Sequence, residues 1–306
     1  MWGLEYFSFR DLWSPLFMAF MMAVAILYTF AVGPWREKFA GSEDVPFKRQ
    51  FSFLLAIFLL YMTQGGPLSL LGHLMFSFHM TNMAISYVIV PPLLLYGIPA
   101  WLWRWMFGRA FWRPLRFLMN PLVGLFMFNL VFSVYHMPGN HDYIMTHYSV
   151  HTAYYVLLLI SAMIMWWHIH CPVPEWARLT PLWRLGYIFV NGLLLTPACV
   201  LIIFANTSLF SVYNDPEVWT KAMGYCVSGD PAALLAKFEG GPAFFNLLSP
   251  RDDQQLGGII MKLVQEFVNV GALFVVFMGW YRSERAKEDD VSGSEATVAP
   301  GRLNNV

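Results

Sequence analysis

Seven runs of mostly apolar residues alternate with polar stretches along the chain. They cover residues 14–33, 50–66, 77–97, 120–137, 148–167, 186–206 and 257–281. A helix needs about 20 consecutive, mostly apolar residues to cross the hydrocarbon core of a bilayer. The pattern therefore predicts an all-α fold, a polytopic membrane helix bundle with seven transmembrane helices.

The connecting segments are short, except for residues 207–255. After Tyr281 the chain is polar and has too few apolar residues to build a core. We therefore predict a seven-helix transmembrane domain over residues 1–281 and a disordered cytoplasmic tail over residues 282–306. The apolar residues of segment 207–255 favour either an interfacial segment on the outer membrane surface or a docking surface for a partner.

Composition supports a membrane protein and argues against a soluble one. Of the 306 residues, 58% are hydrophobic and only 12% are charged, so the chain holds more apolar surface than one soluble core can bury. The formal net charge is zero. We expect membrane lipid around the chain and no nucleic acid among its partners.

Lysine and arginine are concentrated in alternate connecting segments. The first, third and fifth segments and the tail contain Arg36, Lys38, Lys48, Arg49, Arg104, Arg109, Arg113, Arg116, Arg178, Arg184, Arg282, Arg285 and Lys287. Cytoplasmic loops of membrane proteins carry an excess of these residues. We therefore predict the N-terminus outside and the C-terminus in the cytoplasm.

This orientation places six of the eight histidines near the outer face. They are His73, His79, His136, His141, His147 and His151. Residues four apart lie on one face of a helix, so His147 with His151, and His79 with Met83, could each hold one ion. No glutamate follows His147, which argues against a zinc-protease motif. We find no catalytic constellation and predict that the chain is not an enzyme.

The ligand types favour copper. Imidazole suits copper, zinc and iron, whereas a methionine thioether chiefly favours Cu(I). Several methionines lie among the outer histidines, namely Met75, Met80, Met83, Met137 and Met145. Other interpretations stay open, because methionine in an apolar helix commonly only packs, and because interface histidines can simply bond backbone groups or lipid headgroups.

Two further features bear on the chemistry. The predicted topology separates the three cysteines, so no disulfide is expected, and Cys226 is either an outer thiolate ligand or an incidental residue. In the seventh run, Lys262 and Glu266 are four apart, and each is costly near a helix centre unless paired. A structural ion pair is favoured over an ion path, because no chain of carboxylates continues on the other runs.

Three stretches carry a likeness to a known family. They are GGPLSLLGHLMFSFHMTNMAISYVIVPPLLLYGIPAWLWR, YHMPGNHDYIMTHYSVHTAYY and, at the start of the seventh run, DDQQLGGIIMKLVQE. From about residue 10 to about residue 285, the chain resembles the CtaG family, membrane proteins needed to assemble caa3-type cytochrome c oxidase in Gram-positive bacteria. The resemblance implies a multi-pass protein of the bacterial cell membrane. It also implies that cytochrome c oxidase subunits are partners of the chain, and that the chain helps to bring copper to the oxidase at the outer face.

The resemblance carries functional positions with it. The family's histidine positions fall on His79, His136, His147 and His151, and its acidic-glutamine-glycine motif falls on Asp253, Gln254, Gly257 and Gly258. Many relatives have a second histidine where this chain has Met83, and His73 could take its place.

The candidate metal ligands are therefore His79, Met83, His136, His147 and His151, with His73 as a further candidate. The glycines of the seventh run would let that helix approach its neighbours closely. This approach would set Asp253 beside the histidines as a carboxylate that orients them.

Other functions stay open beside copper handling. One is a metal-free scaffold for oxidase subunits. Another is a haem-binding membrane oxidoreductase with axial ligands such as His79 and His151. A copper transporter is disfavoured, because the membrane interior offers mainly amides and one carboxylate, namely Asn129, Asn191, Gln265 and Glu266.

Overall fold

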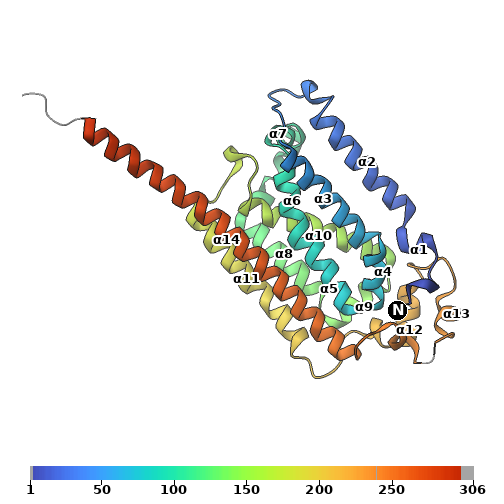
Figure 1. Cartoon of the computed structure of the whole chain (residues 1–306). Helices are drawn as coiled ribbons and strands as arrows, with labels where there is room; N and C mark the ends of the chain where they lie inside the picture. Colours follow the sequence, from blue (N-terminus) through green and yellow to red (C-terminus); the bar gives the residue numbers. More distant parts are fainter. Residues whose placement is uncertain (1–2, 239, 298–306) are drawn as a thin grey trace, which may run out of the picture.

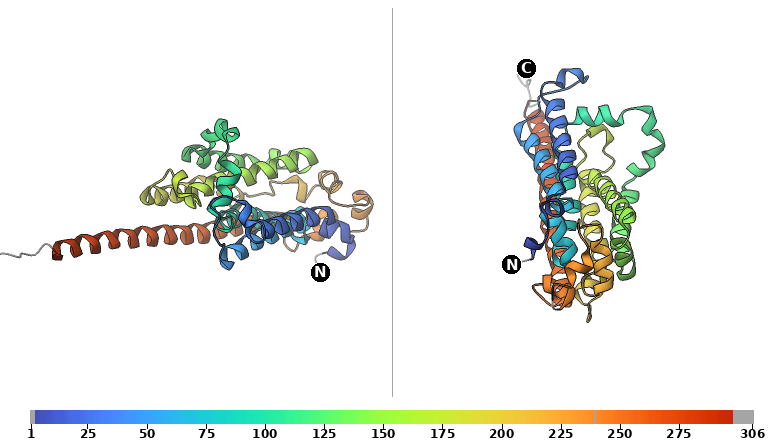
Figure 2. Two further views of the ribbon diagram at one scale, coloured as in Figure 1. Left: turned by 90° about the horizontal axis from the view of Figure 1, so that it is seen from above. Right: turned by 90° about the vertical axis from the view of Figure 1, so that its right-hand side faces the viewer.

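The computed structural model describes residues 3–238 and 240–297. Within these ranges the backbone forms helices, turns and loops, and it contains no strand. The prediction of an all-α fold is confirmed. The helices form a bundle, and α14 (Pro250–Thr297) runs along it and continues past its end (Figures 1 and 2).

The long helices carry most of the hydrophobic sequence. Besides α14 they are α2 (Pro15–Val32), α3 (Phe47–Gln64), α8 (Pro121–Tyr135), α10 (Tyr148–Ile169) and α11 (Pro181–Ile203). The shorter α-helices are α1 (Phe9–Trp13), α4 (Pro67–Leu74), α5 (Phe76–Ala84), α6 (Val90–Gly97), α7 (Ala100–Phe107), α9 (Pro138–Met145), α12 (Pro216–Met223) and α13 (Pro231–Leu235). Many of these helices begin with proline, whose missing N–H is not needed in the first turn.

Tighter or wider turns connect these helices. A π-helical turn, η3 (Ile85–Ile89), joins α5 to α6. The 3-10 turns are η1 (Leu4–Tyr6), η2 (Arg36–Lys38), η4 (Ala110–Met119), η5 (Pro174–Trp176), η6 (Ser211–Tyr213) and η7 (Gly241–Phe245).

Six segments of the described chain are long and apolar enough to cross a membrane. They are Phe9–Val32, Phe47–Leu74, Phe76–Gly97, Tyr148–Ile169, Pro181–Ile203 and Pro250–Glu288. A seventh is obtained if α8 and α9, which are bent by 80° at a short break, count as one broken span. The chain is therefore a multi-pass membrane protein with six or seven spans. Its orientation in the membrane stays a prediction.

Two regions differ from the elements expected from the sequence. Residues 67–74, expected to be a loop, form α4. The helix α14 continues to Thr297, so residues 282–297 are helical where we expected disorder, and residues 298–306 lie outside the described residues. Arginine, glutamate, alanine and lysine are strong helix formers, so a helix that is already nucleated in the bundle continues through them.

Segment 207–255 folds back onto one end of the bundle. It forms η6, α12, α13 and η7, and its apolar side chains pack against α4. Trp219 is fully buried and stacks on Phe245, with ring centroids 5.7 Å apart. The segment is therefore a folded cap over this end, held by its own aromatic contacts.

One face of the first turns of α14 is fastened to α5. The Asp253 carboxylate accepts hydrogen bonds from the Ser77 backbone N–H, at 3.1 Å, and from the Ser77 hydroxyl. One turn later, a Cβ on Gly257 would meet the Phe76 ring at 2.8 Å. Two contacts thus fix α14 against the start of α5, namely the bonds of the Asp253 carboxylate and, four residues later, the close backbone approach at Gly257.

The adjacent face of α14 is fastened to α11 in the same way. Gln254 accepts a hydrogen bond from the Leu209 N–H at 2.7 Å and donates one to the Ile202 carbonyl at 3.2 Å. A Cβ on Gly258 would meet Ile203 at 2.8 Å. The acidic-glutamine-glycine motif therefore joins three helices beside the histidines.

Candidate metal centre

Six histidines gather at one end of the bundle, which we call the histidine-rich end. It is formed by α4, the start of α5, α9, the start of α10 and the first turns of α14, toward the lower right of Figure 1. The structure divides its histidines into a buried group, a pair beside a cavity and one peripheral residue.

His79, His136 and His141 form the first group, which we call the buried trio. Their exposed fractions are 2%, 4% and 0%. The ring centroids of His79 and His141 are 5.1 Å apart, those of His79 and His136 are 5.9 Å apart, and those of His136 and His141 are 6.5 Å apart. The rings come from α5, from the residue that ends α8, and from α9. These separate segments converge only in the folded protein.

The break between α8 and α9 brings the trio together. With 15 residues, α8 is short for a membrane span, about 22 Å at 1.5 Å per residue. Pro138 then begins α9 after the 80° bend. Proline lacks the N–H that would continue the preceding helix. The bend turns the chain back, so that His141 reaches His79.

Asp142 fixes the position of α9. Its carboxylate accepts hydrogen bonds from the backbone N–H groups of Ser211 and Val212, at 3.0 and 3.1 Å, which ties α9 to η6. The Nδ1 atom of His141 lies 3.8 Å from the same carboxylate, beyond hydrogen-bond distance. The His141 ring packs instead on Phe210, with centroids 4.7 Å apart.

The ring nitrogens of the trio are open to a ligand. His136 Nδ1 donates a hydrogen bond to the Phe132 carbonyl at 2.8 Å, and because a carbonyl only accepts, this bond leaves the lone pair on Nε2. That Nε2, the Nε2 of His79 and both ring nitrogens of His141 are buried without a hydrogen-bond partner. Buried polar atoms are normally satisfied. A metal ion bound between these imidazoles would take their lone pairs.

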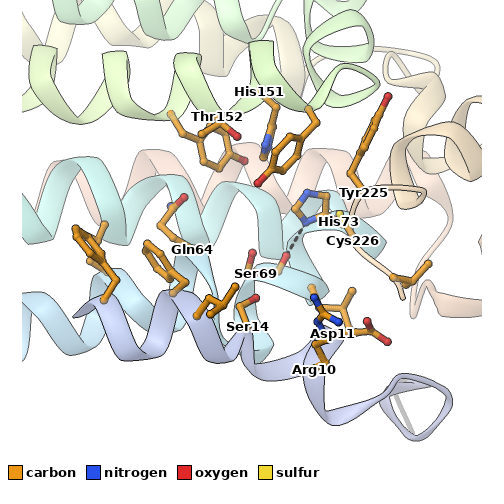
Figure 3. Close-up of a pocket in the computed structure, with 18 of the residues that line it drawn as sticks. Arg10, Asp11, Ser14, Gln64, Ser69, His73, His151, Thr152, Tyr225 and Cys226 are labelled. Carbon is orange, nitrogen blue, oxygen red and sulfur yellow. Dashed lines mark hydrogen bonds between the residues drawn. The ribbon is translucent and has the colours of Figure 1, made fainter. Parts of the chain in front are cut away.

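His73 and His151 form the second group, which we call the cavity pair. Their ring centroids are 5.5 Å apart at the edge of a cavity of about 860 Å³ (Figure 3). His73 Nδ1 donates a hydrogen bond to the Ser69 carbonyl at 2.9 Å, which leaves its Nε2 as an acceptor. His151 Nε2 is buried without a partner. The sulfur of Cys226 lies beside the His73 ring in the same cavity (Figure 3).

Two tyrosines lie between the trio and the pair. The Tyr135 ring is nearly parallel to that of His79, with centroids 5.6 Å apart, and its hydroxyl is 3.4 Å from that of Tyr155. The Tyr155 ring packs on His151, with centroids 4.1 Å apart. The two histidine groups are therefore neighbours, separated by one layer of aromatic rings.

The histidines of the predicted ligand set are not all brought together. His79 and His136 belong to the trio, and His73 and His151 form the pair. His147 is the residue that caps α10, with an extended backbone, so the rule that residues four apart share a helix face does not apply to it. Its Nδ1 donates to the carbonyl four residues earlier at 2.7 Å. His151 therefore faces His73 and not His147.

The other two residues of the predicted set, Met83 and Asp253, contribute to helix packing. Met83 is 1% exposed and lies in the hydrophobic core of the bundle, one helical turn beyond His79. Asp253 bonds to Ser77 rather than to a histidine. Because Ser77 is two residues before His79, the carboxylate influences the trio by holding α5 in place.

His141 is missing from the predicted ligand set, although it is the most deeply buried member of the trio. Its sequence neighbours give a local signal, because Pro138 is typical of a helix start and Asp142 can fasten a helix to a neighbouring backbone. The direction in which His141 points depends on the 80° bend, which local sequence does not specify.

The candidate donors at this end are mostly uncharged, and its sulfur donors are soft. They are imidazole nitrogens, with a thiol and the Met145 thioether at the cavity. Such donors suit copper, and sulfur favours Cu(I). Among the described residues, no group of three His, Cys, Asp or Glu side chains is already spaced to hold a metal ion. A bound ion would therefore require these rings to move closer together.

Comparison with known families gives a match over most of the chain. The family described as "Cytochrome c oxidase caa3 assembly factor (Caa3_CtaG)" matches residues 26–283. This range includes all six histidines of the histidine-rich end and the motif that begins α14. No curated protein and no solved structure matches the chain.

Proposed function

The chain belongs to the cytochrome c oxidase caa3 assembly factor family, and from this membership we propose that its buried trio holds Cu(I) for delivery to the oxidase. A role in assembling cytochrome c oxidase follows from the family and implies association with that enzyme. What we add is the cargo and the residues that hold it. The chain acts as a carrier in this proposal and catalyses no reaction.

One observation carries the proposal. Three imidazoles from separate segments lie within 6.5 Å of one another, centroid to centroid, with buried ring nitrogens that have no partner. Leaving buried polar groups unsatisfied costs about 1–3 kcal/mol each. A fold that needed only packing could place apolar side chains here without that cost. A soft cation bound to the lone pairs would remove it.

The position of the trio suits transfer to a partner in the same membrane. If the N-terminus is outside, as the charge pattern predicts, the histidine-rich end faces the outer side. Neutral imidazoles bind metal and protonated ones do not, so a histidine site holds an ion only while its rings are neutral. With few ligands, the ion is exchangeable, because a receiving site can complete its coordination.

A metal-free scaffold is the second candidate function. It is favoured by the spacing of the ligands, since no group of three among the described residues is already arranged around an ion. It is also compatible with α14, along which large apolar side chains such as Phe267 and Phe274 are exposed. Exposed apolar side chains of this kind would suit helix contacts with oxidase subunits.

The haem-binding alternative finds less support. Its axial ligands would be His79 and His151, but only His151 lines the large cavity. The rings of Tyr135 and Tyr155 lie between these histidines. A haem would have to displace this aromatic layer.

Cu(I) binding tests the proposal directly. The full chain in detergent is offered Cu(I) in competition with a chelator of known affinity, and copper per chain and the visible spectrum are measured. We expect the variant His79→Ala/His141→Ala to hold one copper fewer than the native chain. The matched control is His168→Ala, which removes a buried histidine at the opposite end of the bundle. It should bind as much copper as the native chain.

Two results would contradict the proposal. If the native chain and the trio variant held equal copper while both were folded, the trio would not be the site, and the scaffold function would be favoured. A haem band in the purified native chain would favour the oxidoreductase. Copper content of the oxidase from cells carrying each variant gives the biological readout, which should fall for the trio variant and not for His168→Ala.

A further inference from the structure

We propose that the cavity of the histidine-rich end is a second Cu(I) site, in which His73, His151 and the Cys226 thiolate receive the ion before it reaches the buried trio. The inference deepens the proposed function and rests on it for the destination of the ion. It also assigns a role to Cys226.

Three separate segments bring these side chains to one place. His73 is on α4, His151 is on α10, and Cys226 is in the loop after α12. Figure 3 shows the two imidazoles and the sulfur at one end of the cavity, with Cys226 beside the His73 ring. All three residues line the cavity and none is fully buried. The three residues thus border a cavity and are only partly buried, in contrast to the buried trio.

The two imidazoles have lone pairs to offer. The Ser69 carbonyl fixes the His73 proton on Nδ1, which leaves the lone pair of the ring on Nε2. His151 Nε2 has no hydrogen-bond partner. Imidazole and thiolate together are a donor set that suits Cu(I).

The loop that carries Cys226 is held in position. Two residues later, the Ser228 N–H and hydroxyl donate to the Asp11 carboxylate, at 2.8 and 2.6 Å. Asp11 also caps α1 through Ser8. These bonds fasten the loop to the N-terminal helix and keep the thiol at the cavity. Cys226 is free, and no disulfide removes its sulfur from metal chemistry.

Binding at this site is a ligand exchange without redox change. The Cys226 S–H bond breaks, its proton goes to water, and an S–Cu bond forms while copper stays Cu(I). The metal ligand is the thiolate and not the thiol, so metal binding releases this proton.

A thioether lies between the cavity and the trio. Met145 lines the cavity, and its sulfur is 3.5 Å from the Tyr135 hydroxyl. Tyr135 in turn stacks on His79 of the trio. Methionine sulfur is a soft, weak Cu(I) ligand. A Cu(I) ion leaving the cavity pair would therefore meet Met145 before His79.

X-ray absorption at the copper edge tests the site, because it separates sulfur from nitrogen ligands. The full chain in detergent is loaded with Cu(I) alone. We expect copper–sulfur scattering in the native chain. The variant Cys226→Ser should lose this scattering together with about one copper per chain, because a soft sulfur ligand favours Cu(I). The matched control is Cys171→Ser, which changes a cysteine lining the smaller cavity at the opposite end and should leave the spectrum unchanged. His151→Ala should lose the same copper as Cys226→Ser.

The outcomes separate this inference from the proposed function. If Cys226→Ser kept the native copper content and spectrum, the cavity site would be wrong while copper at the trio stood. If the trio variant kept all its copper and Cys226→Ser lost it, the trio would be wrong as the destination. Sulfur scattering that disappears only in Met145→Leu would overturn the role of Cys226. Melting temperatures of all variants establish that they are folded.

Discussion

Both ends of the bundle contain histidine and cysteine, but within the described part of the chain only the histidine-rich end brings histidines from separate segments together. At the histidine-rich end, three buried imidazoles converge from α5, α8 and α9. At the opposite end, which we define by His168, His170 and Cys171, the buried His168 ring meets the edge of Tyr187 at 5.9 Å between centroids. Its Nε2 is also without a hydrogen-bond partner. An unsatisfied imidazole is therefore common to both ends, and convergence is what distinguishes them.

Charge distinguishes the two ends further. A cavity of about 440 Å³ at the opposite end is lined by His170 and Cys171, but also by Arg49 and Arg184. Burial lowers the pKa of His170, and the nearby Arg184 lowers it further. Burial raises the pKa of the Cys171 thiol. Guanidinium groups repel a cation, and no carboxylate of the described residues lines this cavity, whereas the cavity of the histidine-rich end is lined by Asp11 beside Arg10.

The two ends are also fastened differently. At the histidine-rich end, buried carboxylates and amides bond to the backbone of neighbouring segments, as Asp253 does with Ser77. At the opposite end, the exposed ion pair of Arg104 and Glu175 joins α7 to η5. Buried hydrogen bonds to a charged group contribute more than an exposed ion pair. Of these two fastenings, the stronger one lies at the end that holds the candidate ligands.

Removing the Asp253 carboxylate should produce the largest loss. Asp253→Ala removes two charge-assisted hydrogen bonds to Ser77, and we expect the free energy of unfolding in detergent to fall by about 3 kcal/mol. Because α5 carries His79, Cu(I) affinity should fall about tenfold as well. Denaturant titration and chelator competition measure the two effects. Unchanged copper affinity would show that Asp253 does not orient the trio.

Asp252→Ala is the matched control for this prediction. Asp252 is the neighbouring acid on the same helix, and its exposed carboxylate accepts a bond from the Ser249 hydroxyl. Its removal should cost far less stability and leave Cu(I) affinity unchanged. Equal losses for the two variants would mean that the charge of this turn matters, and not the buried bonds.

A smaller loss of unfolding free energy should follow when one methyl group is added where α14 contacts α5. In Gly257→Ala the new Cβ would lie 2.8 Å from the Phe76 ring and 3.1 Å from both Met80 and the Phe76 carbonyl oxygen. Overpacking of this kind costs about 1–3 kcal/mol. Gly271→Ala on the same helix is the control, because nothing lies within 4 Å of its Cβ position. Alanine favours helix over glycine, so this control should be neutral or stabilising.

A pair of tyrosine variants should give opposite results at the two ends. The Tyr213 hydroxyl donates to the Gly72 carbonyl at 3.0 Å, and burial raises the pKa of Tyr213 well above its usual range, so it stays a donor. Tyr213→Phe should cost about 1 kcal/mol of unfolding free energy. The Tyr187 hydroxyl is buried without a partner, so Tyr187→Phe should be neutral or stabilising. If both variants lowered the melting temperature by the same amount, the contrast between the two ends would be wrong.

Hydrophobic patterning predicted the fold class and most of the spans, because a membrane helix must be apolar over its whole length. It misjudged residues 67–74, since the short helix α4 and a loop of the same composition give the same pattern. It also did not reveal that α8 ends early and that α9 turns away. A bend of 80° is set by packing against η6 and α5, which lie far away in the sequence.

The candidate site could be predicted only in part. The histidines themselves are visible in the sequence, and His79 with His136 do meet in the structure. The expected partnership of His147 with His151 assumed that both residues lie within one helix, whereas His147 precedes α10. The position of Cys226 beside His73 depends on a long segment folding back over α4. Such long-range contacts leave no periodic trace in the sequence.

The exposed ion pair at the opposite end should give the smallest effect. Arg104 donates to both carboxylate oxygens of Glu175, at 2.6 and 3.1 Å, and this hydrogen bonding lowers the pKa of Glu175. A lowered acid pKa stabilises the fold above the unfolded value, about 4.3, and this stabilisation is lost as pH falls through the folded value. Glu175→Gln should therefore lower the melting temperature at pH 7 by no more than about 2 °C, because solvent screens the pair. The difference from the native chain should vanish as pH falls through this lowered folded value, where the carboxylate becomes protonated. A loss as large as that of Asp253→Ala would show that this exposed ion pair and the buried bonds of Asp253 hold the two ends equally.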